Sequence, residues 1–223
     1  MKALLIETAT PACAVGLYLD GAITTVVEPG DREHTEQLMP AIVTLLADQG
    51  VRLADLDRVI VDRGPGLFTG MRVGLATAAA LAQANDAALV GVTSLELYAH
   101  DAHAAGVRGT LLAAVDGRRG ELFVQQFTLD DTVTAASEPA VTTATDVLIT
   151  WGTLGAPATI TGDGVARYFD LLAPVPNFTV LERDVPSVRE GLLLGVAREP
   201  NDVLPLYLRD ADAVANFTVR TRS

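Results

Sequence analysis

The sequence contains almost no cysteine, which limits how the fold can be stabilised. A single cysteine, Cys13, occurs among 223 residues, so no disulfide can form within the chain. Cys13 lies in the apolar stretch 12–15, where a buried, unreactive thiol is more common than a nucleophile. Such low cysteine usage is typical of a reducing compartment, and we expect a cytoplasmic location.

Long apolar runs and positive charge are also scarce. No apolar run approaches the roughly 20 residues that a membrane-spanning helix needs, so we expect no membrane association. The 28 acidic residues outnumber the 16 basic ones, which gives a formal net charge of −12. Nucleic acids are bound mainly through Lys and Arg, so any contact with RNA is expected to depend on a more basic partner. Hydrophobic residues make up 49% of the chain, enough to build a packed core.

The first half of the sequence predicts three strands and a helix, followed by a strand–helix–strand–helix unit. Apolar runs predict strands at 3–8, 14–20, 22–28, 58–62 and 88–92. Helical spacing predicts helices at 35–49, at 71–84 and from Ser94 onward. The Asp20-Gly21 pair between two apolar runs indicates a hairpin, and residues 29–31 are expected to break the sheet.

The same order of elements recurs in the second half, without identity at the level of residues. Strands are expected at 109–115, 121–128, 132–139 and 158–161, and helices at 143–151 and 164–172. Strands that alternate with helices predict an α/β fold with mixed sheets flanked by helices. We place the boundary at residues 105 and 106, which gives a first lobe of 1–105 and a smaller second lobe of 106–223.

Five stretches carry a resemblance to known proteins. They are residues 4–8, 63–74, 91–96, 115–123 and 205–213. Glu7-Thr8, Gly64-Pro65-Gly66 and Val115-Asp116 resemble the two-lobed actin, Hsp70 and sugar-kinase fold, also called the ASKHA or RNase H-like fold. All five stretches in order resemble the TsaB (YeaZ-type) family of glycoprotease-like proteins. That resemblance implies a bacterial partner protein in the synthesis of threonylcarbamoyladenosine on tRNA.

The resemblance also implies a paralogue of the catalytic transferase TsaD that lacks the catalytic groups of that enzyme. The transferase carries two metal-binding histidines where this chain has Ser94 and Tyr98, and an acidic pair where this chain has Thr-Pro-Ala at 10–12. We therefore expect no catalytic residue, no metal ligand and no cofactor. Glu7 and Leu67 depart from the family pattern, which usually has Asp and Ser at these positions.

A second set of residues marks the place where kinases of this fold bind a nucleotide, and we treat it as a vestigial cleft. The set is Glu7, Thr8, Gly64, Gly66, Asp116, Gly162 and Gly164. The Gly64-Pro65-Gly66 loop joins a strand to a helix, where backbone N–H groups can hold an anion; a tight turn capped by Thr69 explains it equally well. The segment 162–164 either approaches an adenosine or forms a turn. For Asp116, hairpin capping or a partner contact is favoured over nucleotide chemistry.

The first two helices present more apolar surface than one sheet needs. In the first helix the apolar residues between 38 and 46 span roughly 160°, whereas covering a sheet takes an arc of ~100° or more. The second helix is rich in small residues, which let another helix approach closely. One continuous core explains any single residue, but the pair predicts half of a four-helix bundle with a homologous chain. The predicted partner interface is Leu38, Met39, Ile42, Val43, Leu46, Val73, Thr77, Ala80 and Ala84.

These observations predict a non-catalytic scaffold and activator that dimerises with TsaD in the formation of t6A at adenosine 37 of tRNA. The resemblance implies the small ATPase TsaE as a further partner, contact with tRNA only through the complex, and a homodimer when the chain is alone. The rival hypothesis is an ATP-dependent phosphotransferase of the sugar-kinase fold, which would use the same cleft residues. Few acidic groups in the first lobe and a small second lobe argue against it.

Overall fold

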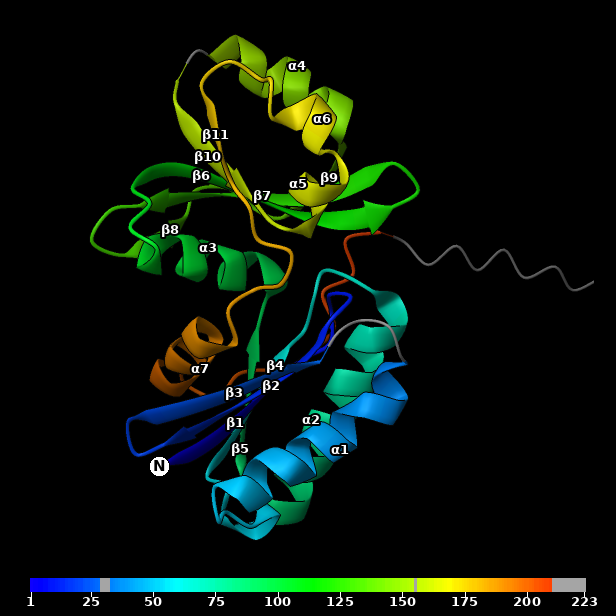
Figure 1. Ribbon diagram of the computed structural model, residues 1–223, viewed down its shortest axis with the longest axis vertical. Coiled ribbons are helices and arrows are strands. Elements are labelled where there is room, and N and C mark those ends of the chain that lie inside the picture. Colours follow the sequence, from blue (N-terminus) through cyan, green and yellow to red (C-terminus); the bar gives the residue numbers. More distant parts are fainter. Residues whose placement is uncertain (29–32, 155, 210–223) are drawn as a thin grey trace, which may run out of the picture.

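The computed structural model describes residues 1–28, 33–154 and 156–209, and these form two lobes, each built on one sheet (Figure 1). The expected sheet break at 29–31 and residues 210–213 of the last resemblance stretch lie outside the described residues. No helix in the described part of the chain is long and apolar enough to cross a membrane.

The first sheet has five strands in the order β3-β2-β1-β4-β5. The strands are β1 (Lys2–Glu7), β2 (Cys13–Leu19), β3 (Ala22–Glu28), β4 (Arg58–Asp62) and β5 (Ala88–Val92). Strand β1 pairs antiparallel with β2 and parallel with β4. The expected hairpin at Asp20-Gly21 is confirmed, and both residues have positive φ, at 47° and 101°.

Helices cover both faces of this sheet. Helices α1 (His34–Asp48) and α2 (Phe68–Asn85) lie side by side on one face, and the short η1 (Leu53–Asp55) packs against α2 (Figure 1). Helix α7 (Val188–Ala197) packs on the other face. Strand β1 supplies both contacts because its side chains alternate: Leu4 and Ile6 face α1 and α2, whereas Leu5 faces α7. Buried on both faces, β1 is the centre of the first core.

The second lobe repeats this order of strands as β8-β7-β6-β10-β11, and β9 also pairs with β7. The strands are β6 (Gly109–Arg118), β7 (Glu121–Leu129), β8 (Val133–Ala135), β9 (Ala140–Thr143), β10 (Ala158–Thr161) and β11 (Phe178–Leu181). The helices are α4 (Ala144–Leu154), α5 (Asp163–Arg167) and α6 (Phe169–Leu172). The α/β class is thus confirmed, with two lobes that are each built on a mixed sheet flanked by helices.

Two helices cross between the lobes. Helix α3 (Ser94–Ala104) follows the first sheet but packs against β6 and β7 of the second, whereas α7 follows the second sheet and packs against the first. The two helices also contact each other and stack between the sheets (Figure 1). The division at residues 105 and 106 stays a prediction, but the residues of the expected second lobe do not all pack there, because α7 belongs to the core of the first.

Several expected elements differ in detail. The helix expected at 164–172 is two short helices, α5 and α6, because the backbone leaves helical geometry at Tyr168. The helix expected at 71–84 begins earlier, at Phe68. Thr69 therefore lies inside the first turn and does not cap the helix; Leu67 is the N-cap residue and makes no side-chain capping hydrogen bond. Strands β9 and β11 and helix α7 were not expected.

Candidate functional site

Glu7, the first residue of the predicted cleft, ends the central strand β1 and is fully buried. The backbone N–H and the hydroxyl of Thr10 each donate a hydrogen bond of 2.9 Å to its carboxyl group. Burial, together with the nearby charge of Asp62, raises the pKa of Glu7 to about 8. Glu7 is therefore mainly protonated at neutral pH and is enclosed by protein.

Asp62 ends the strand next to that of Glu7, and the sequence analysis did not identify it as a site residue. It follows Val61, which pairs with Ile6 across the parallel strands, so the two acids end neighbouring strands. Ser94 donates a hydrogen bond of 2.7 Å from its hydroxyl to Asp62, and the Gly64 backbone N–H donates another of 2.8 Å. Burial raises the pKa of Asp62 to about 7. One signal for Asp62 was available in the sequence: both acids lie at the carboxyl ends of strands, and parallel neighbouring strands would bring these ends together.

Ser94 and Tyr98 occupy the positions where the resemblance places two histidines in the transferase. Here both hydroxyls form hydrogen bonds within the protein. Tyr98 is fully buried at the junction of the lobes. Its hydroxyl donates to the Asp184 carbonyl at 3.2 Å and accepts from the Asp163 N–H at 3.3 Å. Ser94 binds the strand end at Asp62. In the ranges that the structure describes, no three His, Cys, Asp or Glu residues form a group able to hold a metal.

The Gly64-Pro65-Gly66 loop packs directly against the backbone of the same chain at Ala9. A Cβ atom on Gly66 would lie 2.1 Å from the Ala9 carbonyl oxygen, which also accepts a 2.6 Å hydrogen bond from the Leu67 N–H. The same close contact continues along α2, where added Cβ atoms on Gly70 and Gly74 would lie 2.1 and 2.3 Å from oxygen atoms of Thr8. These glycines bring α2 against the end of β1, which favours the structural interpretation of the loop over an anion site.

Asp116 lies in the second lobe, only 5% exposed, between two arginines. Its carboxylate pairs with Arg118 at 2.9 Å and with Arg167 at 3.5 Å. It also accepts a 2.9 Å hydrogen bond from the Arg118 backbone N–H, the hairpin contact expected from the sequence. Asp163 accepts a 3.1 Å bond from the Asp116 N–H, and burial raises the pKa of Asp163 to about 6. Arg167 and Asp163 were not identified from the sequence.

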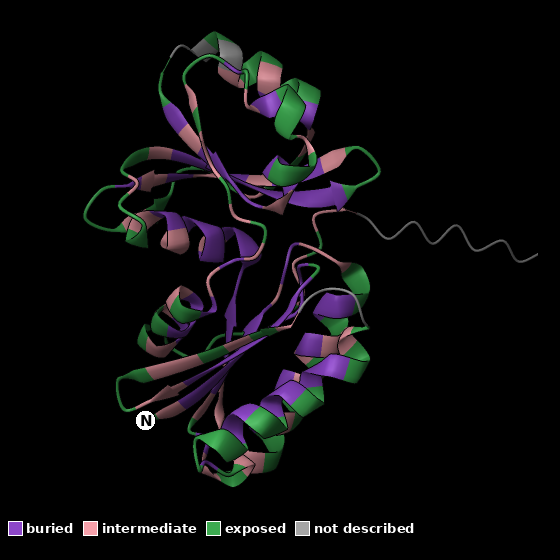
Figure 2. Cartoon of the chain, in the orientation of Figure 1, coloured by how far each residue is buried: buried purple, intermediate pink, exposed green. Residues whose placement is uncertain are grey.

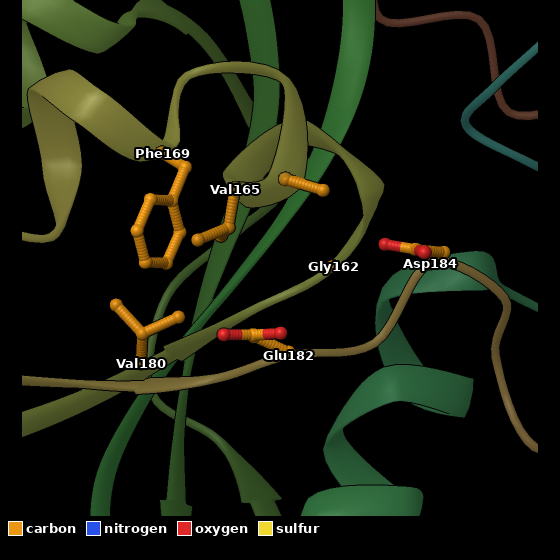
Figure 3. A pocket seen from close by; sticks show the side chains of 7 residues that line it. Gly162, Val165, Phe169, Val180, Glu182 and Asp184 are labelled. Carbon is orange, nitrogen blue, oxygen red and sulfur yellow. The ribbon is translucent and has the colours of Figure 1, made fainter.

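Two hollows lie near these residues. One, of about 530 Å³, separates the lobes and is lined by Pro11 and Ala12 on one side and by Asp116 and Arg167 on the other. The second, of about 260 Å³, lies within the second lobe between Phe169 and Val180, with Gly162 at one side (Figure 3). Pro11 and Ala12 of the non-ionising Thr-Pro-Ala segment therefore face the space between the lobes, whereas Thr10 is buried against Glu7.

The structure divides the predicted cleft set. Asp116 and Gly162 line the hollows, whereas Glu7, Thr8 and Gly64 are buried in the junction below them. The positions of the two second-lobe glycines are set by packing. A Cβ on Gly162 would lie 2.1 Å from the Ala114 carbonyl, and one on Gly164 would lie 2.6 Å from Leu122. Gly66, half-buried, contacts Ala9 as described above. The seven residues therefore do not surround one cavity.

The predicted partner interface on α1 and α2 is divided in the same way. Leu38, Ile42 and Leu46 are buried in the first core, so their expected role in an interface is wrong for a simple reason: the sheet already covers them. Val73 and Thr77 are half-buried. The exposed members form an outer face of both helices (Figure 2), and these are Met39, Val43, Ala80 and Ala84. Val43 is 53% exposed.

Comparison with known proteins identifies similar sequences and structures. The family described as TsaD, tRNA N6-adenosine threonylcarbamoyltransferase, matches residues 25–178. The tRNA threonylcarbamoyladenosine biosynthesis protein TsaB of Escherichia coli K12 is 36% identical over 131 residues, which cover 59% of this chain and 57% of that protein. This match thus spans little more than half the length of the relative.

Other relatives match over nearly their whole length. An uncharacterized protein of Mycobacterium tuberculosis is 35% identical over 215 residues, which cover 94% of this chain and 92% of that protein. The solved structure titled YeaZ from Pseudomonas aeruginosa superposes with a TM-score of 0.79 at 26% identity, covering 93% of this chain and 99% of that one. Sequence and structure therefore agree along most of the chain.

Proposed function

The chain belongs to the family of tRNA N6-adenosine threonylcarbamoyltransferases and is a TsaB/YeaZ-type member of it, and on that premise we propose that it is a non-catalytic scaffold and activator of the TsaD transferase. In this proposal TsaD carries out the transfer to adenosine 37 of tRNA. The chain holds TsaD in its active arrangement, in the cytoplasm and without a cofactor of its own.

The hydrogen bonding of Ser94 and Tyr98 carries this proposal. The sequence resemblance places metal-binding histidines of the transferase at both positions, and here both hydroxyls form hydrogen bonds within the protein. Serine and tyrosine hydroxyls in these bonds do not reproduce a pair of imidazole ligands. Pro11 and Ala12, which face the space between the lobes, supply no acid or base there. The chain thus keeps the fold of a transferase lobe pair without its catalytic groups.

The outer face of α1 and α2 supports association with a related chain. Met39 and Val43 on α1 and Ala80 and Ala84 on α2 are exposed, and the two helices contact each other, so the face offers both apolar contact and small residues that allow close approach. In the proposal this face pairs with the corresponding helices of TsaD, and with a second copy when TsaD is absent. TsaE binds the assembled pair, and tRNA is contacted only in the complex, because the chain alone carries a net charge of −12.

The rival phosphotransferase hypothesis finds less support. Glu7 would have to reach a nucleotide or its metal, but it is fully buried and hydrogen-bonded to Thr10. The Asp116 carboxylate is already paired with Arg118 and Arg167, so these arginines compete with any metal or phosphate group that it would have to bind. Measurable ATP turnover by the pure chain that is lost on Asp116→Ala would revive this hypothesis.

Reconstitution tests the proposal directly. Purified TsaD, TsaE, tRNA and the threonylcarbamoyl donor are incubated with and without this chain, and modified nucleosides are measured by mass spectrometry. We expect product only when both TsaD and this chain are present, and none from this chain without TsaD. Equal product formation by TsaD alone would contradict an activator role, and product from this chain alone would contradict a non-catalytic one.

A further inference from the structure

Two aromatic rings and an arginine form an exposed cluster beside the junction of the lobes. Phe68, at the first position of α2, is 51% exposed, and Tyr207, in the C-terminal segment, is 45% exposed. The Arg72 guanidinium lies 3.7 Å from the centroid of the Phe68 ring, and its Nε–H donates a 2.9 Å hydrogen bond to the Tyr207 hydroxyl. We call these three residues the aromatic–arginine ridge.

The ridge is assembled from segments that lie far apart in the sequence. The Phe68 and Tyr207 ring centroids are 5.6 Å apart, and the rings are tilted by 35°. The segment that carries Tyr207 is fixed to the end of β4, because the Leu206 N–H donates a 2.8 Å hydrogen bond to the Arg63 carbonyl. The side chains are therefore held in place before any partner binds, which lowers the entropy cost of binding.

The charge of Arg72 is available to a partner. Although the sequence has 28 acidic residues, Arg72 forms no ion pair with a carboxylate of residues 1–28, 33–154 or 156–209. Phe68 also lines a hollow of about 350 Å³, with Arg118 of the second lobe among the other residues around it. Arg72 thus lies over an exposed ring at the edge of this hollow, whereas Arg118 is already paired with Asp116 and Glu33 is also among the lining residues.

We propose that the aromatic–arginine ridge contacts an unpaired nucleotide of the tRNA, with its base against Phe68 and Tyr207 and a phosphate at Arg72. Unstacked RNA bases are bound on aromatic and guanidinium planes, and arginine forms paired hydrogen bonds with phosphate. A docking site for an apolar protein segment would fit less well, because the unpaired guanidinium would then be buried without a counter-charge. This inference rests on the proposed function, which brings tRNA to the complex.

Binding of an anticodon stem-loop RNA to the full-length chain in complex with TsaD tests the inference. Affinity is measured by fluorescence anisotropy over a series of salt concentrations. Phe68→Leu keeps an apolar side chain but removes the stacking ring, and we expect it to weaken binding roughly tenfold. Arg72→Gln is expected to lower the slope of log affinity against log salt by about 1. Arg52→Gln, at an arginine whose side chain is 79% exposed and paired with Asp55, is the matched control and should change neither.

The affinity of each variant for TsaD is measured in parallel. An unchanged RNA affinity for both ridge variants would overturn the inference. A loss of TsaD affinity with unchanged RNA binding by the preformed complex would also overturn it, and would identify a protein-docking surface instead. If the wild-type chain fails to bind TsaD, the proposed function fails first and the inference fails with it. These outcomes are distinguishable because only the last is seen before any variant is compared.

Discussion

Both lobes place five strands in the same order, yet only the first lobe covers a face of its sheet with two long helices. Helices α1 and α2 have 15 and 18 residues, whereas their counterparts α4, α5 and α6 have 11, 5 and 4. The first lobe therefore has a continuous helical surface that can serve a partner. The second lobe has shorter helices around a hollow. One topology thus provides a continuous helical face, the surface proposed for association, in one repeat and not in the other.

The acids near the ends of the central strands differ as well. Glu7 in the first lobe is fully buried and shares its surroundings with Asp62, whereas Asp116 in the second pairs with two arginines. Burial without a neighbouring cation raises the pKa of Glu7 in the first lobe, whereas the second lobe places two arginines beside its buried acid.

Close backbone packing is expected in both lobes, and glycine substitutions test it with the largest effects. Gly162→Ala should destabilise the second lobe by about 4 kcal/mol, because a Cβ would clash with Ala114 and φ is +119°. Gly66→Ala should destabilise the first lobe by about 3 kcal/mol through its clash with Ala9. Gly21→Ala, at φ +101° in open space, is the control and should cost about 1–2 kcal/mol. Denaturant unfolding provides the values, and equal costs at all three sites would contradict close packing.

The pH dependence of stability separates the two acids. The folded-state pKa of Glu7, about 8, lies above its ordinary value of 4.5, so its protonation stabilises the fold. This contribution is complete below pH 4.5 and is lost as the pH rises through about 8. Asp62, with a pKa of about 7, acts in the same direction. We therefore expect the free energy of unfolding to fall from mildly acidic to alkaline pH.

Glu7→Gln is the variant for this measurement, since it keeps a polar side chain that cannot ionise. Its unfolding free energy should vary less with pH than that of the wild type. Asp163→Asn in the second lobe should change the dependence only at lower pH, because the pKa of Asp163 is about 6. A wild-type stability that rises between neutral and alkaline pH would contradict the assignment of Glu7.

The contact between the lobes is tested by Tyr98→Phe. This change removes the acceptor of the Asp163 N–H and the donor to the Asp184 carbonyl, so we expect a loss of about 1–2 kcal/mol of stability. Tyr18→Phe, on a half-buried strand position of the first lobe, is the control. Hydrogen exchange should show faster exchange at Asp163 and its neighbours in Tyr98→Phe. Unchanged exchange there would mean that the hydroxyl does not hold the lobes together.

Most regular elements were predictable because local patterns determine them. Alternating apolar runs gave β1 to β7 within a few residues, and Asp20-Gly21 gave the hairpin. Helix α7 was missed although Ser187 accepts a capping hydrogen bond from Glu190, a recognisable start signal. Its place on the first sheet depends on contacts between distant residues, which no local pattern contains. The strand β11 is only four residues long, too short for periodicity to be decisive.

The candidate site was less predictable than the fold. Apolar spacing identified the helices that form the outer face, but it did not separate Leu38 and Ile42, which face the sheet, from Met39 and Val43, which face solvent. That distinction depends on where the sheet lies. The pairing of Glu7 with Asp62 likewise depends on which strands become neighbours.

The smallest expected effect on stability is for charges placed on exposed apolar residues. Val43 in the first lobe and Ile149 in the second are 53% and 56% exposed. Val43→Asp and Ile149→Asp should therefore each change the free energy of unfolding by no more than about 0.5 kcal/mol. Thermal unfolding monitored by circular dichroism checks this, and a large loss for either variant would mean that its side chain is part of the core.

Because these two variants are matched in exposure and in charge, their association with TsaD tests the central claim most directly. Complex formation is measured by size-exclusion chromatography with light scattering. The account predicts that the wild type and Ile149→Asp bind TsaD, whereas Val43→Asp and Ala80→Asp remain folded but do not. Complex formation by both helix-face variants at wild-type affinity would contradict it.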